Sequence, residues 1–282
     1  MRRFACLALA TAFAASPALA QSEPAAGQLP TPEEISTRDS LTIGLGAAVT
    51  PDYEGSNDYR IIPAGAIRGK YKGISFSTRG TYLFVDVVPG SGKFELDAGP
   101  IVGVRMNSRR HIEDDVVEDL PRLKRAFEVG GFAGVSFHGL TNPYDTLALR
   151  LDVLHDIGNA HESTTFTPNL EFSTPLSRTT YLGASVGAEF VANRYADYYF
   201  GITPAGSLAS GLPVFNPDGG MKNWKLGLLL NQSLSGDLLH GFSIFGAGQY
   251  SRLVGDFKRS PIVDDRGSPN QWLGAIGIAY TF

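Results

Sequence analysis

The sequence has little of three features that mark other classes of protein: cysteine, long apolar runs and charge of one sign. Its 282 residues include one cysteine, Cys6, which lies in a segment that we interpret below as a removed signal, so no disulfide framework is expected. No run of about 20 apolar residues occurs, which excludes a helical membrane span. A net charge of −4 does not favour nucleic acid as a partner.

The amino-terminal region has the features of an export signal. Two arginines precede an apolar stretch at residues 4–14, and an A-x-A cleavage sequence occupies residues 18–20. We therefore interpret residues 1–20 as a signal peptide that is removed after Sec export. Residues 21–40 contain three prolines and no apolar period, which predicts a flexible periplasmic leader.

The rest of the chain alternates apolar residues with polar or small ones. In residues 41–50 the odd positions are all apolar, and a period of two is typical of a strand with one face in an apolar environment. Eleven segments show the pattern: 41–50, 60–72, 74–86, 94–106, 127–137, 147–153, 166–172, 180–192, 224–232, 242–250 and 271–282. The sequence therefore predicts an all-β fold, a closed antiparallel transmembrane β-barrel over residues 41–282.

The number of strands in such a barrel is expected to be even, because both ends of the chain lie in the periplasm. Eleven segments therefore imply that one strand is missed or misread. Counting from the two ends places the discrepancy between Pro51 and Phe94. We predict about twelve strands, with ten as the alternative, and long outward connections at 107–126, 193–221 and 254–270.

The last segment carries an assembly signal. Trp272, Ile276, Ile278, Tyr280 and Phe282 share one face, and the segment ends on an aromatic residue. This pattern resembles the signal that closes outer-membrane barrels, with Tyr280 and Phe282 as its main positions.

Several motifs point to one family. Residues 44–56 read GLGAAVTPDYEGS and resemble the opening signature of the MipA/OmpV family of MltA-interacting outer-membrane proteins. Further similar motifs are Gly99-Pro100, Tyr198-Tyr199-Phe200-Gly201, Tyr250-Ser251-Arg252-Leu253 and Ser260-Pro261-Ile262-Val263. The resemblance implies a location in the outer membrane of a Gram-negative cell. It also implies a role in scaffolding murein-synthesising and murein-cleaving enzymes, or at the surface, and brings no catalytic triad or metal site.

Charged residues on the polar parity are expected to face the lumen. An Arg or Lys on the lipid face costs roughly 2–4 kcal/mol at the midplane. The predicted lumen charges are Arg60, Arg68, Lys70, Arg79, Glu95, Asp97, Arg105, Glu128, Arg150, Asp152, Glu171 and Glu189. They form either an ion-pair network that plugs a narrow barrel or a pore with a transverse field, and the small size favours the plug.

No catalytic, cofactor or metal site is predicted. His155, His161 and Ser163 lie close in sequence, but spacing alone does not make a hydrolase and two histidines do not make a zinc site. The acidic run at 113–119 is expected to be neutralised by Arg122, Lys124 and Arg125 on an exposed segment.

Two further motifs have a structural interpretation. Residues 51–58 are predicted to be a turn rather than a ligand loop, because they combine Pro, Asp, Gly and Asn. The aromatic residues at positions 195, 198, 199 and 200 are predicted to join the interfacial belt rather than an adhesive tip.

We therefore expect a non-enzymatic scaffold that interacts with peptidoglycan-remodelling enzymes. A small porin-like channel or a surface adhesin is the alternative. The expected partners are outer-membrane lipid and a murein hydrolase or synthase in the periplasm, and no cofactor or nucleic acid is expected.

Overall fold

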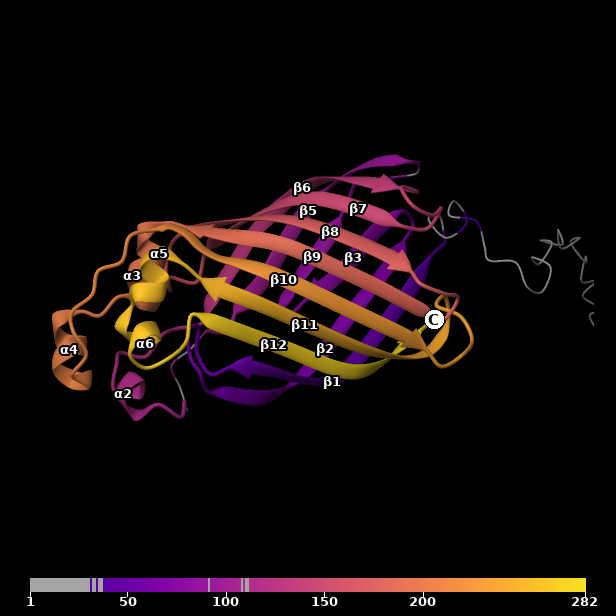
Figure 1. Ribbon diagram of the computed structural model, residues 1–282. Helices are drawn as coiled ribbons and strands as arrows, with labels where there is room; N and C mark the ends of the chain where they lie inside the picture. Colours follow the sequence, from indigo (N-terminus) through magenta and orange to yellow (C-terminus); the bar gives the residue numbers. More distant parts are fainter. Residues whose placement is uncertain (1–30, 32–33, 35–37, 91, 108, 110–111) are drawn as a thin grey trace, which may run out of the picture. The chain divides into compact units, whose positions relative to one another are not determined.

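The computed structural model describes residues 31, 34, 38–90, 92–107, 109 and 112–282 (Figure 1). The predicted signal peptide lies outside the described residues, as does most of the predicted leader.

The described residues form a closed barrel of twelve antiparallel strands, as predicted. Each strand pairs with its neighbours in sequence, and the last strand pairs with the first. The strands are β1 (Ser40–Pro51), β2 (Tyr59–Tyr71), β3 (Ile74–Arg79), β4 (Tyr82–Asp86), β5 (Phe94–Arg105), β6 (Ala126–His138), β7 (Thr146–Asp156), β8 (Thr164–Pro175), β9 (Thr180–Val191), β10 (Gly220–Ser233), β11 (Gly241–Leu253) and β12 (Asn270–Thr281).

The missing strand lies in the segment 74–86, within the range expected to contain it. The chain turns back at Gly80, whose φ of 58° suits a tight turn, so the segment forms β3 and β4 instead of one strand. Arg79 opposes Tyr82 across this turn. The side chains that face the lumen are therefore at odd positions in β3 and at even positions in β4. A two-residue turn without a proline gives a weak sequence signal, which explains the miscount.

The outer surface of the wall is apolar and carries aromatic residues toward both ends. At the end where β12 finishes, Tyr280 packs against Phe242 and Phe282 with ring centroids 4.8 and 4.7 Å apart. At the other end Tyr250 packs between Trp224 and Trp272. Two aromatic girdles on either side of an apolar band are typical of a transmembrane barrel.

The connections at the two ends differ in length. Five short turns, at residues 72–73, 87–93, 139–145, 176–179 and 234–240, lie at what we call the turn end. The opposite end, the cap end, carries the long connections with five short helices (Figure 1). These helices are α2 (Asp115–Glu118), α3 (Asn193–Phe200), α4 (Pro204–Ser210), α5 (Gly255–Arg259) and α6 (Pro261–Asp264). None of the helices in the described part of the chain is long and apolar enough to cross a membrane.

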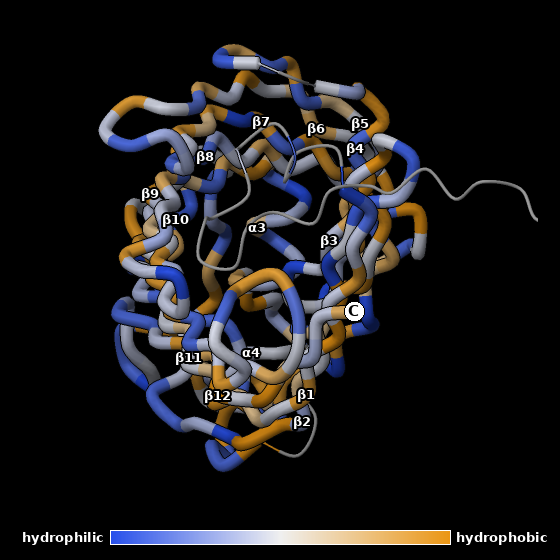
Figure 2. Tube along the Cα trace, turned by 90° about the vertical axis from the view of Figure 1, so that its right-hand side faces the viewer, coloured by the Kyte–Doolittle hydropathy of each residue, from blue (hydrophilic) through white to orange (hydrophobic). Residues whose placement is uncertain are grey.

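The cap end has its own hydrophobic core. Four connections and the ends of two strands bring their apolar side chains together there, and α3 lies within the outline of the barrel when it is viewed along its axis (Figure 2). The buried residues of this cap core are Tyr53, Ile112, Val117, Leu120, Leu123, Val191, Tyr195, Ala196, Tyr199, Phe200, Ile202, Leu212, Leu253, Phe257, Ile262 and Val263. A core of this size keeps the long connections folded over the barrel mouth.

Candidate functional site

A contact across the barrel identifies the inward face. Arg79 on β3 makes a bidentate pair with Glu171 on β8, and four strands of the wall separate β3 from β8, so the two side chains can meet only through the lumen. Following the register from this pair around the wall places all twelve charged residues predicted for the lumen on the inward parity.

The middle of the lumen holds one network of charges. Arg150 binds Asp152 through Nε and Oδ1 at 2.7 Å and reaches Glu171 at 3.3 Å. Since Glu171 also accepts from Arg79, two strands far apart in sequence are tied together through this carboxylate. Opposite charges alternate here, which favours neutralisation of the interior.

Aromatic side chains fill the space beside this network. Phe84 and Phe132 point inward with ring centroids 5.9 Å apart, and they pack with Ile101 and Leu154 in a small buried cluster. The Arg150 guanidinium lies 5.0 Å from the Phe84 centroid, within the range of a cation–π contact. Side chains of β4, β6 and β7 therefore project into the lumen and pack together at this level.

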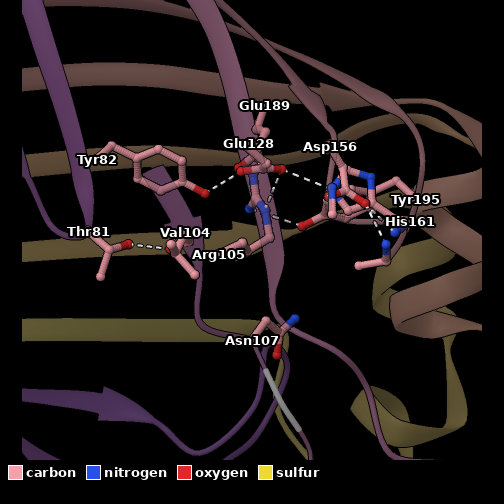
Figure 3. Close-up of polar contacts among 12 residues, drawn as sticks. Thr81, Tyr82, Val104, Arg105, Asn107, Glu128, Asp156, His161, Glu189 and Tyr195 are labelled. Atoms are coloured by element: carbon pink, nitrogen blue, oxygen red, sulfur yellow. Dashed lines mark hydrogen bonds and ion pairs between the residues drawn. The ribbon is translucent and has the colours of Figure 1, made fainter. Parts of the chain in front are cut away.

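A second network lies under the cap, and Figure 3 shows its central residues. Arg105 Nε lies 3.1 Å from Glu128 and Nη2 lies 3.3 Å from Glu189. Lys222 Nζ lies 3.0 Å from Glu189 and 2.6 Å from Glu54. We call this set the cap network. The side chains of Glu128, Glu189 and Lys222 are buried and those of Arg105 and Glu54 are partly buried, so each charge depends on its partners.

Tyr195 connects the cap network to helix α3. Its hydroxyl accepts from Arg105 at 3.2 Å and from Lys222 at 2.9 Å, and it donates to Glu54 at 3.0 Å. Burial raises the pKa of this hydroxyl well above its usual value, so it stays neutral and can donate and accept at once.

Glu128 is the other centre of the cap network. It accepts hydrogen bonds from the Tyr82 hydroxyl and from Arg105, and it pairs with His161 Nε2 at 3.0 Å (Figure 3). The Glu128 side chain is inaccessible to solvent, and these three partners replace the water that its carboxylate would otherwise bind.

Sequence periodicity missed Lys222. The register between β9 and β10 shifts between Met221 and Asn223, so Lys222 is the extra residue of a β-bulge. A bulge re-aims a side chain that strict alternation would direct elsewhere. No counting of parity along residues 224–232 could have placed this lysine in the lumen.

The aromatic residues at 195–200 do not form an interfacial belt, so that prediction was wrong. Tyr195, Tyr199 and Phe200 are at most 2% exposed and belong to the cap core. The segment forms helix α3, and it turns into the barrel because its aromatic side chains find buried partners there, such as Phe257 against Phe200 at 5.2 Å. Burial also raises the pKa of the Tyr199 hydroxyl.

The turn at residues 51–58 is structural, as predicted. The Asp52 amide donates to Asp58 O at 3.0 Å, and the buried Tyr53 hydroxyl donates to Ile262 O at 3.0 Å. Gly55 N donates to Gln271 Oε1 at 3.0 Å. The turn therefore also anchors the cap to β12.

The charge partners of the 113–119 segment differ from those expected. Asp114 pairs with Arg266 at 2.8 Å and caps α2 through Val117 N. Among the described residues no ion pair within 4.0 Å joins this segment to Arg122, Lys124 or Arg125. The interaction raises the pKa of Arg266 and ties α2 to the 254–269 connection.

Arg109 anchors the connection after β5. Its guanidinium donates to Tyr199 O at 2.7 Å, and burial lowers its pKa to about 10, which leaves it charged at neutral pH. This contact holds the connection against helix α3.

The remaining predicted charges lie closer to the strand ends. Glu95 lies 3.4 Å from His138 Nε2, Asp97 accepts from Ser136, and Arg60 lies 4.0 Å from Asp52. Arg68 and Lys70 have no ion pair within 4.0 Å among the described residues. Most basic and acidic groups thus pair near the cap end and in the middle of the lumen. Arg68 and Lys70 of β2 face inward near the turn end.

The histidines and Ser163 do not form a hydrolase arrangement. His161 Nε2 is held by Glu128, and His155 Nδ1 contacts Thr164 Oγ1 at 3.0 Å. Ser163 Oγ is buried without a hydrogen-bond partner among the described residues, so neither imidazole activates it. The described residues also contain no group of three His, Cys, Asp or Glu side chains placed to hold a metal ion.

Comparison with known proteins relates the chain to one family. The sequence model of the family described as MltA-interacting protein MipA matches residues 43–282. The MltA-interacting proteins of Escherichia coli K12 and Shigella flexneri are each 31% identical over 99 residues, which span 34% of this chain and 36% of each relative's length.

Solved outer-membrane barrels match most of the chain at low sequence identity. The monoaromatic hydrocarbon channel CymD is 9% identical with a TM-score of 0.39, and the match covers 89% of this chain and 91% of CymD. OmpT of Vibrio cholerae is 7% identical with a TM-score of 0.36, covering 86% of this chain and 97% of OmpT.

Proposed function

Because the chain belongs to the MipA family, we propose that it is a non-conducting interaction protein of the outer membrane that binds a murein-cleaving enzyme of the MltA kind at its turn end. The observation that carries the proposal is the cap core together with the buried charges beneath it at the barrel mouth. A barrel that does not conduct can act only through its exposed surfaces.

Two layers obstruct a path along the barrel axis. The cap network occupies the lumen near the cap end, where Lys222 is only 1% exposed. The cap core covers this network at the barrel mouth. The mid-lumen charges and Phe84 with Phe132 form the second layer. Opening a path through the cap network would require breaking buried ion pairs, which costs several kcal/mol.

The orientation follows from the lengths of the connections. Outer-membrane barrels have short periplasmic turns and longer outward loops, so the turn end faces the periplasm, where murein enzymes act. Four of its turns carry an exposed aliphatic side chain, namely Val87, Leu140, Leu176 and Leu234. Exposed apolar groups on a polar rim are typical of a protein-binding surface.

The turn at 139–145 is rigid enough to present such a group. The Asp145 carboxylate accepts from the Thr141 hydroxyl at 2.5 Å and from the amides of Leu140, Thr141 and Asn142. A partner that binds Leu140 therefore pays little entropy for ordering this turn.

Affinity capture from detergent-solubilised envelopes tests the interaction. A variant with Leu140, Leu176 and Leu234 changed to Ser is expected to lose the murein enzyme that the unmodified protein retains. The matched control is Leu208→Ser on α4, which removes an 88% exposed leucine at the cap end and is expected to retain the enzyme. Failure of the unmodified protein to recover any murein enzyme contradicts the proposal.

Planar-bilayer recordings test closure separately. The folded protein is expected to give no single-channel steps. Regular steps from the unmodified protein would favour the porin-like alternative instead.

A further inference from the structure

The wall is incomplete in one sector. β3 and β4 have six and five residues, whereas the other ten strands have eleven to fourteen. β2 pairs with β3 only from Arg68 to Tyr71. On the cap side of the β3–β4 turn, the wall therefore lacks two strand halves, and we call this gap the wall notch.

The β2 edge that borders the notch is built as an open edge. Its last link to β3 is a side chain, because Ile67 N donates to Thr78 Oγ1 at 2.9 Å. Beyond this point the ladder from Tyr59 to Ala66 has β1 as its only strand partner among the described residues. Pro63 lies in this stretch, and proline inside a strand is confined to edges because it lacks an N–H.

A groove of about 550 Å³ lies on the other side of the turn tip. Its lipid-side wall is formed by apolar residues of β4, β5, β6 and the connection after β7, among them Leu83, Val102, Phe127 and Ile157, and all four side chains are exposed. Its inner end is formed by Tyr82 and Glu128. The groove thus runs from the bilayer-facing surface to the edge of the cap network.

We propose that this groove binds one acyl chain of an outer-membrane lipid. The volume is in the range of about 300–1,000 Å³ that is usual for ligand pockets. The groove opens onto the face that already contacts the bilayer, so a lipid reaches it without leaving the membrane. Its lining is mostly apolar, and burial of CH₂ groups drives the binding.

The inner end selects a hydrocarbon rather than a charged group. Glu128 is already bound by Tyr82, Arg105 and His161, so it offers no free site to a cation, and it repels an anion. The polar part of the lipid stays outside the groove, because the lining is mostly apolar.

Site-directed quenching tests the proposal in a chain that has no cysteine after residue 6. Val102→Cys and the control Leu226→Cys are each labelled with bimane; both residues are outward-facing and 47% exposed. The protein comprising residues 21–282 is held in a steroid-based detergent, which supplies no acyl chain. A phosphatidylcholine with dibrominated stearoyl chains is then titrated as the quenching probe.

The Val102 label is expected to show saturable quenching with a midpoint about tenfold lower in lipid than the Leu226 label, which corresponds to about 1.4 kcal/mol. Filling the groove with Val104→Trp, or with Leu83→Trp as a second variant, is expected to remove the saturable phase. Equal quenching curves at the two labels overturn the proposal. So does a saturable phase that persists in both filled variants, once heat-modifiability on gels shows that they are folded.

Discussion

The cap end and the turn end of this barrel are stabilised by different interactions. At the cap end, long connections share a hydrophobic core that rests on buried, mutually paired charges. At the turn end, short turns such as the one at Asp145 are held by local hydrogen bonds, and four of the five turns leave an aliphatic side chain in solvent. Substitutions at the cap end should therefore propagate, whereas those at the turn end should remain local.

The largest effect is expected from Glu189→Gln. Glu189 binds Lys222, Lys225 and Arg105, and removing one charge of a buried set leaves the others uncompensated, at a cost of about 3–5 kcal/mol. Urea unfolding in lipid vesicles measures this change, and bilayer recordings are expected to show new conductance steps. Glu162→Gln, in an exposed pair with Arg194, is the matched control. If Glu189→Gln lowers the free energy of unfolding no more than this control does, the cap network does not hold the cap.

A smaller effect is expected from Tyr53→Phe. The change removes the buried hydrogen bond to Ile262 O and leaves the rings of the cap core in place, so the free energy of unfolding should fall by about 1–2 kcal/mol. Proteolysis of the 254–269 connection should accelerate in parallel. Unchanged proteolysis would mean that the 51–58 turn does not anchor α6.

At the turn end, the stability of the 139–145 turn should depend on pH through Asp145. The Thr141 hydroxyl and three backbone amides hold the pKa of Asp145 at about 2, below its unfolded value of about 3.9. The lowered pKa stabilises the turn fully above the unfolded value, and this contribution is lost as the pH falls from about 4 through 2. Hydrogen exchange at the Thr141 and Asn142 amides measures it. Asp145→Asn should abolish this pH dependence, and exchange that keeps the same pH profile in the variant would contradict the assignment.

The smallest effect is expected from Leu208→Ser on α4. This leucine is almost fully exposed, and surface substitutions away from specific contacts change stability by no more than about 0.5 kcal/mol. A larger loss in vesicle unfolding would show that α4 belongs to the cooperative cap.

Periodicity predicted the wall well and the cap poorly. Alternation reports which face of a strand meets lipid, and the lipid requirement is strict, so residues such as Arg79 and Glu171 could be placed on the inner parity without coordinates. Their pairing could not be predicted, because it depends on which strands face each other across the lumen.

The failures come from residues that leave the two-residue period. Lys222 is re-aimed by a bulge, Gly80 reverses the chain in a turn of two residues, and Tyr199 lies on a helix whose burial depends on partners far along the chain. A tyrosine cluster after a barrel strand has the same sequence appearance in a belt and in a cap. Only the tertiary contacts distinguish the two.

The seam between β1 and β12 has a consequence for biogenesis. Its two strands pair from Thr42–Thr281 to Val49–Gly274, and the hydroxyls of Thr42 and Thr281 meet at 2.9 Å across 239 positions. Loop-closure entropy makes contacts of such long range late events in folding. Until the seam forms, the nascent sheet presents two bare edges that invite aggregation. Both edges, β1 and β12, must therefore stay shielded from other chains until the cylinder closes.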